Sequence, residues 1–203
     1  MSQNIGSPIE SPLDRVTPPS AATRKSGPVI GIDVGTSWCR VGVTRNGQAQ
    51  LVQEGPRPAA IPAFVGVSPQ GRILVGQPAQ RQLASAPENT VFGIKQLLAP
   101  YRSPEARSLR QQLRCHVFGG QDERSWVHFG DRSFSPRELV AMLLCQARDL
   151  AQNFLGQPIH RTVVGMPPGW DDGLRAELIG AVALAGLHLV GTVPEPEAVA
   201  RAQ

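Results

Sequence analysis

The chain has 203 residues, of which 41% are apolar, 5% aromatic and 18% charged, and its formal net charge is +4. This composition allows one sizeable core or two small lobes and excludes a fibrous protein, and no apolar run reaches the ~18 residues that a membrane-spanning helix needs. The cationic residues are dispersed among acidic ones and lack aromatic stacking partners, which argues against nucleic acid as a partner.

Residues 1–27 are rich in Ser, Pro and Thr, with little apolar content and no periodicity. Such a segment predicts a disordered tail, with a solvated extension as the simpler interpretation and a regulatory or docking tail as the alternative. The first residues also lack the basic and then apolar pattern of a secretory signal, so we expect a cytoplasmic protein without membrane association.

Residues 28–54 predict an antiparallel meander. A short apolar run ends at a Gly-Thr-Ser turn, which is typical of a buried strand. The next segment alternates and leads into Asn46-Gly47, a pair that favours the type I′ turn of a hairpin. The predicted strands are 29–34, 38–44 and 49–54.

Residues 55–135 mix short strands and short helices between prolines. The part from about 64 to 135 has the pattern of a small subdomain inserted into a larger lobe. We expect strands at 64–67, 72–75, 126–129 and 133–134, and helices at 78–86, at 91–98 and from Ser103-Pro104-Glu105 onward.

Residues 135–193 carry the clearest helix and strand signals. Ser135 and Glu138 form a capping box, an apolar seam follows at helical spacing, and Gly156 can end that helix. A strand at 159–165, a helix from Asp171 or Asp172 to Ala185 and a strand at 187–193 follow. A meander followed by helix, strand, helix and strand predicts a mixed α/β sheet flanked by helices.

Three cysteines, Cys39, Cys115 and Cys145, are far apart and odd in number. No Cys-x-x-Cys pair occurs, so a structural zinc site and a disulfide framework are both disfavoured. We expect buried or half-buried thiols.

The segment Asp33 to Ser37 places a carboxylate at a strand end, before a turn that carries two hydroxyl groups. Backbone N–H groups and hydroxyls of such a turn can hold phosphate oxygens, and the Asp can hold a hydrated divalent ion beside them. The segment lacks the Gly-x-x-x-x-Gly-Lys pattern of a P-loop. An ordinary tight turn remains the alternative.

In its wider context, the segment 31–37 (GIDVGTS) resembles the first phosphate-binding segment of the actin, hexokinase and heat-shock ATPase superfamily. The stretches 74–82 (LVGQPAQRQ) and 87–95 (PENTVFGIK) are similar to the nucleotide-binding domain of the 70-kDa heat-shock (DnaK-type) chaperones. Further similar positions follow in order at 164–167, Asp171, Asp172, Arg175, 185–187, Glu195 and Pro196. The resemblance covers roughly residues 28–203 and implies a lobe of the actin-like ATPase (ribonuclease H-like) fold.

The same resemblance implies binding of ATP or ADP with Mg²⁺. It implies that Asp33 coordinates Mg²⁺ largely through water, and that the phosphates contact the turn and one lysine. The implied nucleotide-binding residues are Asp33, Gly35, Thr36, Ser37 and Lys95.

The resemblance also implies two catalytic residues and two relay residues. Lys95, one of only two lysines in the chain, would reach the γ-phosphate and help place the attacking water, and Glu195 would orient or partly deprotonate that water. A surface position for Lys95 and a helix-capping role for Glu195 remain the alternatives. Pro167 and Arg175 match positions that relay the nucleotide state in this family.

Several residues depart from the family pattern. Trp38-Cys39 replaces a small polar pair, Pro194 stands where Asn is usual, Glu197 where Thr is usual, and Gly169 where an aromatic is usual. The second phosphate loop (an Asp-Gly-Gly-Gly-Thr type segment), the adenosine pocket and the peptide-binding domain are missing from these 203 residues. We therefore expect a truncated, divergent N-terminal lobe that binds nucleotide weakly and hydrolyses it hardly at all.

Three functions remain open at this point. The first is the ATP-binding lobe of a chaperone whose parent acts in protein folding and the stress response. Such a parent couples ATP hydrolysis to the binding and release of unfolded, hydrophobic polypeptides, with co-chaperones as further partners. The second is a non-catalytic interaction module that retains the ATPase fold, and the third is a sugar-kinase or actin-like relative with the same phosphate turn.

Overall fold

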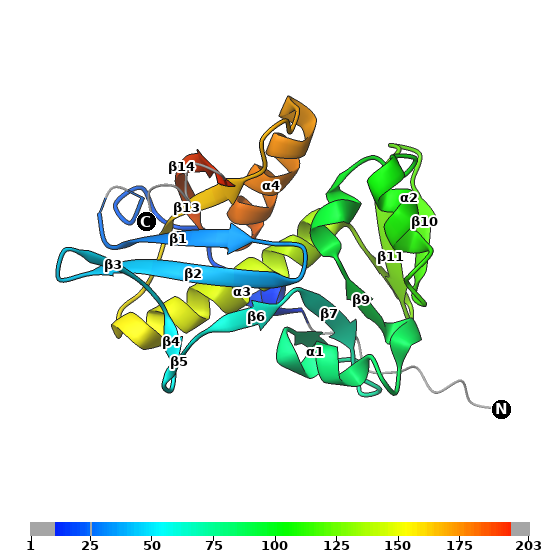
Figure 1. Cartoon of the computed structure of the whole chain (residues 1–203), viewed down its shortest axis with the longest axis horizontal. Coiled ribbons are helices and arrows are strands. Elements are labelled where there is room, and N and C mark those ends of the chain that lie inside the picture. Colours follow the sequence, from blue (N-terminus) through cyan, green and yellow to red (C-terminus); the bar gives the residue numbers. More distant parts are fainter. Residues whose placement is uncertain (1–10, 25, 196–203) are drawn as a thin grey trace.

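A six-stranded mixed sheet forms the centre of the computed structural model, which describes residues 11–24 and 26–195 (Figure 1). The strand order is β14-β13-β1-β2-β3, and β6 pairs with β2 beside β3. Strands β1, β13 and β14 run parallel, whereas β2 is antiparallel to β1, β3 and β6. The strands are β1 (Val29–Val34), β2 (Trp38–Arg45), β3 (Gln48–Leu51), β6 (Ala60–Pro62), β13 (Arg161–Met166) and β14 (His188–Pro194).

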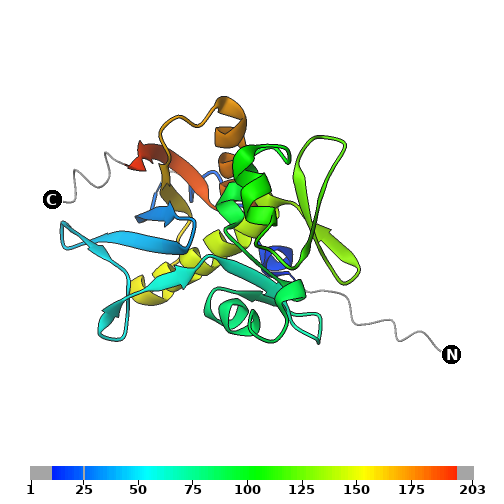
Figure 2. The same ribbon diagram turned by 45° about the vertical axis from the view of Figure 1, so that its right-hand side comes forward.

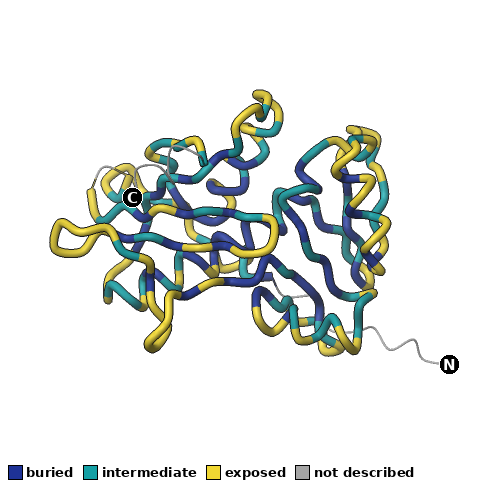
Figure 3. The backbone as a smooth tube through the Cα atoms, in the orientation of Figure 1, coloured by how far each residue is buried: buried dark blue, intermediate teal, exposed yellow. Residues whose placement is uncertain are grey.

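Two helices cover one face of this sheet. Helix α3 (Pro136–Leu155) packs against β1 and β2, and α4 (Asp172–Leu184) packs against α3 and β14. The predicted capping box of Ser135 begins α3, and Gly156, with φ of 68°, ends it. Alternate residues of β1, beginning with Ile30, are buried. Because successive side chains of a strand point to opposite faces, the residues between them face the side of the sheet that α3 and α4 leave open. Figure 3 shows the burial along the backbone.

Residues between β6 and α3 build a separate group of small elements (Figure 2). It holds two three-stranded sheets, β8-β7-β9 and β10-β11-β12, joined by short helices. Its strands are β7 (Phe64–Val67), β8 (Ile73–Val75), β9 (Thr90–Phe92), β10 (His116–Gly119), β11 (Ser125–Phe129) and β12 (Arg132–Phe134). Its helices are α1 (Gln77–Gln82), η2 (Pro87–Asn89), η3 (Ile94–Leu98) and α2 (Pro104–Arg110), where η denotes a 3₁₀ helix.

One carboxylate links this group to the helical layer. Glu177 on α4 forms a bidentate pair with Arg137 on α3, at 2.8 and 3.0 Å, and a second pair at 3.0 Å with Arg124, which precedes β11. The η3 helix adds apolar contacts with α3 and α4. The inserted group is therefore held against the helices at more than one point.

The N-terminal segment differs from the expected disordered tail. Residues Pro12–Arg15 form a 3₁₀ turn, η1, with a capping box between Ser11 and Asp14. Ser11 is only 3% exposed, and Leu13 and Val16 pack against the core, where η1 contacts α3. Apolar side chains and a self-capped turn thus hold this stretch on the surface of the fold. Residues 1–10 and 25 of the expected tail lie outside the described residues.

Two local predictions were wrong. The predicted third strand does not continue from 49 to 54: it breaks at the fully buried Val52, and β4 (Gln53–Glu54) then pairs with β5 (Arg57–Pro58). The predicted helix at 91–98 is β9 followed by η3, because Gly93 adopts a left-handed conformation between them, with φ of 63°.

The hairpin turn, the buried thiols and the fold class agree with the predictions made from the sequence. Asn46 and Gly47 have φ angles of 53° and 76°, as a type I′ turn requires. All three cysteines are free and buried. Among the described residues, no helix combines the length and the apolarity needed to cross a membrane. The fold class is the predicted one, a mixed α/β sheet of antiparallel and parallel strands with flanking helices.

Candidate functional site

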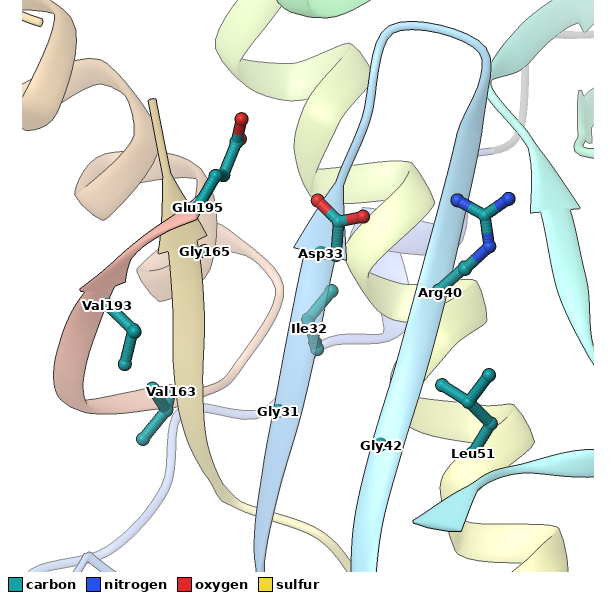
Figure 4. Close-up of a pocket in the computed structure, with 10 residues that line it drawn as sticks. All are labelled: Gly31, Ile32, Asp33, Arg40, Gly42, Leu51, Val163, Gly165, Val193 and Glu195. Carbon is teal, nitrogen blue, oxygen red and sulfur yellow. The ribbon is translucent and has the colours of Figure 1, made fainter. Parts of the chain in front are cut away.

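Two carboxylates stand near each other at the end of the central sheet, on its open face (Figure 4). Asp33 stands near the end of β1, Glu195 directly follows β14, and Gly165 of β13 lies between them. A Cβ atom on Gly165 would lie 3.8 Å from Oδ1 of Asp33 and 3.8 Å from Cγ of Glu195. The missing side chain therefore leaves a space between the two carboxylates.

That space belongs to an open cavity of about 560 Å³ on the uncovered face of the sheet. Glycines and apolar side chains line its floor, and Asp33, Arg40 and Glu195 stand together at one end (Figure 4). The cavity is thus a mostly apolar surface with charged groups gathered where the strands end. Such concave, apolar sites with a few converging polar groups are typical of ligand pockets.

The turn after β1 requires glycine at position 35. The N–H of Gly35 donates to the carbonyl oxygen of Trp38 at 2.9 Å, and a Cβ atom on Gly35 would lie only 2.6 Å from that oxygen. Any larger residue would push the turn apart. Since its own N–H is already bonded, Gly35 shapes the turn rather than offering a donor.

Thr36 and Ser37 form the exposed tip of the same turn. Within the part of the chain that the structure describes, neither their N–H groups nor their hydroxyls form hydrogen bonds. These groups are free to receive an anion, because an N–H or hydroxyl at an exposed tip loses only water when it binds a phosphate oxygen.

Lys95 reaches the same end of the sheet from the inserted group. Its Nζ atom lies 2.5 Å from Oε1 of Glu195, and its side chain is only 9% exposed, against 36% for Glu195. Nζ also lies 5.5 Å from the centre of the Trp170 ring, a cation–π distance. Lys95 is therefore not a surface lysine.

The two expected relay residues lie on the segment that holds Trp170. Nε of Arg175 donates to the carbonyl oxygen of Trp170 at 3.0 Å, and Lys95 faces the ring of the same Trp170. Arg175 and Lys95 are therefore linked through one shared residue. Pro167 follows the last residue of β13 and is half-buried. The structure thus brings Arg175 toward Lys95 through Trp170 and leaves Pro167 beside the strand end.

The buried thiol of Cys39 lies beneath these charges. Burial, and to a smaller extent the carboxylate of Asp33, raise the pKa of Cys39 to about 12, although the nearby Arg40 and Lys95 act in the opposite direction. Asp33, Arg40 and Lys95 therefore all act electrostatically on one thiol in the floor of the sheet. A thiol so protonated is not a nucleophile at neutral pH.

The donor set fits a hydrated Mg²⁺ with phosphates rather than a metal held by protein alone. No group of three or more His, Cys, Asp or Glu side chains that could hold a metal occurs among residues 11–24 and 26–195. Asp33 has no hydrogen-bond or ion-pair partner within those residues. Mg²⁺ keeps several waters and binds through one or two carboxylates and substrate phosphates, so one unpaired Asp beside free N–H and hydroxyl groups suits it.

The structure brings together Asp33, the turn and the Lys95–Glu195 pair, and it adds two residues that the sequence analysis missed. Trp170 has no sequence signal that separates it from a packing residue. The position of Arg40 could have been found, since a short turn that pairs Val34 with Cys39 also places Arg40 opposite Asp33. Glu197, one of the departures from the family pattern, lies outside the described residues.

Most of this chain matches the model of a known protein family. Residues 29–203 match the model of the family described as Hsp70 protein. The match includes every strand of the central sheet and all of the site residues described above, and it begins after the N-terminal segment that packs on α3.

Proposed function

The chain belongs to the Hsp70 family, and from this premise we propose that residues 28–203 are the N-terminal lobe of an ATP-binding domain. In this proposal the open end of the central sheet binds the phosphates of ATP or ADP with Mg²⁺. The observation that carries it is the convergence of Asp33, the Gly35 turn and the Lys95–Glu195 pair at one strand end.

The turn provides the phosphate contacts in this proposal. Thr36 and Ser37 offer unbonded N–H and hydroxyl groups, and Gly35 keeps the turn tight enough to present them. Asp33 would hold Mg²⁺ through its waters. When bound, Mg²⁺ neutralises charge on the phosphate oxygens.

Lys95 and Glu195 are the proposed catalytic residues. The ammonium of Lys95 is nearly buried, so it acts as a fixed positive charge that offsets negative charge on a transferring phosphoryl group. The same ammonium fixes one oxygen of Glu195 and leaves Oε2 without a partner among the described residues. That second oxygen is suited to accept a hydrogen bond, and then a proton, from an attacking water.

We further propose that this lobe serves a chaperone in which ATP hydrolysis controls the binding of unfolded polypeptides, with co-chaperones as partners. Arg175 and Pro167 would relay the nucleotide state, and the contact from Arg175 to Trp170 and on to Lys95 supports that assignment for Arg175. A cytoplasmic location and a role in the stress response belong to the same proposal.

Nuclear magnetic resonance titration of the 203-residue chain tests the nucleotide site. Titration with Mg-ADP and Mg-ATP should shift the amide signals of Gly35, Thr36 and Ser37 at weak affinity. Lys95→Ala should weaken the ATP effect more than the ADP effect, and Arg81→Ala, an exposed residue of helix α1 outside the cavity, serves as the control. Shifts spread over the surface without a maximum at the turn would contradict the proposal.

A second candidate is a non-catalytic interaction module. It is favoured by two large apolar side chains near the open face of the sheet, Trp38 and Leu51, which are 37% and 42% exposed. The same titration separates the two, because a module that has lost its nucleotide site leaves the amides at the turn unmoved. The match to the Hsp70 family supports a chaperone lobe over the sugar-kinase and actin-like alternatives.

A further inference from the structure

Arg40 stands directly opposite Asp33 in the central sheet. The register of β1 and β2 pairs the two residues, and residues opposite each other on antiparallel strands have neighbouring side chains on one face. Both side chains lie on the open face and line the same cavity as Glu195 (Figure 4). Arg40 is therefore part of the charged end of the site.

The guanidinium of Arg40 is available to bind a ligand. Within residues 11–24 and 26–195 it forms no ion pair and no hydrogen bond, and its side chain is exposed to solvent. Lys95, in contrast, is bonded to Glu195 and faces Trp170. Of the cavity-lining residues described, Arg40 is the one that brings a positive charge.

The cavity holds two carboxylates, so a bound polyphosphate would need a positive charge that the Arg40 guanidinium can supply. Asp33 and Glu195 both face the space where the proposed phosphates would lie, and two carboxylates repel a polyanion. Thr36 and Ser37 provide donors but no charge. An arginine fork binds phosphate oxygens through two parallel hydrogen bonds, which is the geometry that a lysine cannot supply.

We propose that Arg40 is a further phosphate-binding residue of this site, which takes the polyphosphate of a nucleoside di- or triphosphate. The inference rests on the proposed function and adds a residue that neither the sequence motifs nor the family resemblance assigned. From β2, Arg40 contacts the phosphates on the side opposite to Lys95. It offsets the charge of Asp33 and Glu195 when less Mg²⁺ is present.

The test compares Arg40→Ala, Arg40→Lys and the unchanged chain by calorimetric and resonance titration with Mg-ATP, with ATP in the presence of a chelator, and with adenosine. Arg40→Ala should weaken ATP binding by about tenfold or more, because it removes the positive charge and the paired hydrogen bonds of the guanidinium. The loss should be larger when Mg²⁺ is removed, and Arg40→Lys should recover part of it. Adenosine has no phosphate for Arg40 to contact, so its titration should not differ among the three proteins, and the thermal unfolding midpoint should not change.

Arg57→Ala is the matched control, since Arg57 is an exposed strand arginine outside the cavity. If Arg40→Ala binds ATP like the unchanged chain while Lys95→Ala is weakened, the Arg40 proposal fails and the proposed function stands. If the unchanged chain binds no phosphate compound, both fail. If Arg40→Ala loses ATP binding and Lys95→Ala does not, the Arg40 proposal is supported and the proposed role of Lys95 is wrong.

Discussion

The Nζ atom of Lys95 and the Oε1 atom of Glu195 lie 2.5 Å apart, although 100 positions separate the two residues in the chain. The pair joins the inserted group of small elements to the end of the central sheet. Because Lys95 is nearly buried and Glu195 is partly exposed, the pair lies between a surface ion pair and a fully buried one in its effect on stability.

Removing the acidic partner should therefore destabilise the fold measurably. We expect Glu195→Gln to lower the free energy of unfolding by about 1–2 kcal/mol, because it leaves a nearly buried ammonium without its counter-charge. Urea unfolding measures the change. The matched control is Asp149→Asn, which removes the exposed carboxylate of the Arg148–Asp149 pair and should cost less than about 0.5 kcal/mol. Equal costs at the two sites would contradict this account.

Gly35→Ala should disrupt the turn and the proposed phosphate contacts together. The added Cβ would lie 2.6 Å from the carbonyl oxygen of Trp38, so the turn must open and its hydrogen bond must lengthen. We expect a loss of about 1–3 kcal/mol in unfolding free energy and the loss of nucleotide-dependent shifts at the turn. Gly191→Ala in β14 is the control, since a Cβ there meets nothing within 4 Å. A Gly35→Ala protein with normal stability would show that the turn tolerates the methyl group.

Trp170 should shield Lys95 from reagents. The chain holds only two lysines, so the labelling of Lys95 by an amine-reactive probe can be read by mass spectrometry against Lys25. Trp170→Ala should raise the rate at Lys95 several-fold, because it removes the ring that lies 5.5 Å from Nζ. Trp170→Phe retains an aromatic face and should restore most of the protection. An unchanged rate in Trp170→Ala would mean that Glu195 alone holds the ammonium.

The three thiols should resist alkylation at neutral pH and should make the fold sensitive to alkali. Burial raises the pKa of Cys39 and Cys115 to about 12 and that of Cys145 to about 11, from an ordinary value of 9.0. A raised pKa in the folded state adds stability that is fully present below pH 9 and is lost as the pH rises toward 12. Unfolding curves should show this loss, and a variant with all three cysteines changed to Ala should show a flatter dependence. A native protein that reacts quickly with a thiol reagent at pH 7 would contradict the burial of these groups.

Leu13 and Val16 should stabilise the lobe although they precede the matched family region. Both pack against the core next to α3, so Leu13→Ala with Val16→Ala should lower the free energy of unfolding by about 1–3 kcal/mol. The exposed Pro18→Ala serves as the control. No change in the double variant would show that the segment contributes little in solution.

Local signals predicted the parts of the fold that depend on neighbouring residues. A capping box and apolar spacing identified α3, an Asp at the helix start identified α4, and the Asn46-Gly47 pair identified its hairpin, because such signals act over a few residues. The left-handed glycine at position 93 was harder to foresee, since glycine permits that conformation without requiring it.

The candidate site was predicted less completely, and for a physical reason. Asp33 and its turn are contiguous in the sequence, so their chemistry could be inferred directly. The contact of Lys95 with Glu195 and Trp170 depends on how η3 packs against α3 and α4, and no periodicity in either segment encodes that packing. The family resemblance named Lys95 and Glu195 but not Trp170.

The N-terminal turn has a practical consequence for anyone who prepares this lobe. A recombinant protein trimmed to the family boundary at residue 29 would lack Leu13 and Val16 and would leave their apolar contact area on the core open to water. Poor yield or aggregation of such a trimmed protein would then reflect the cloning boundary rather than an intrinsic weakness of the ATPase fold.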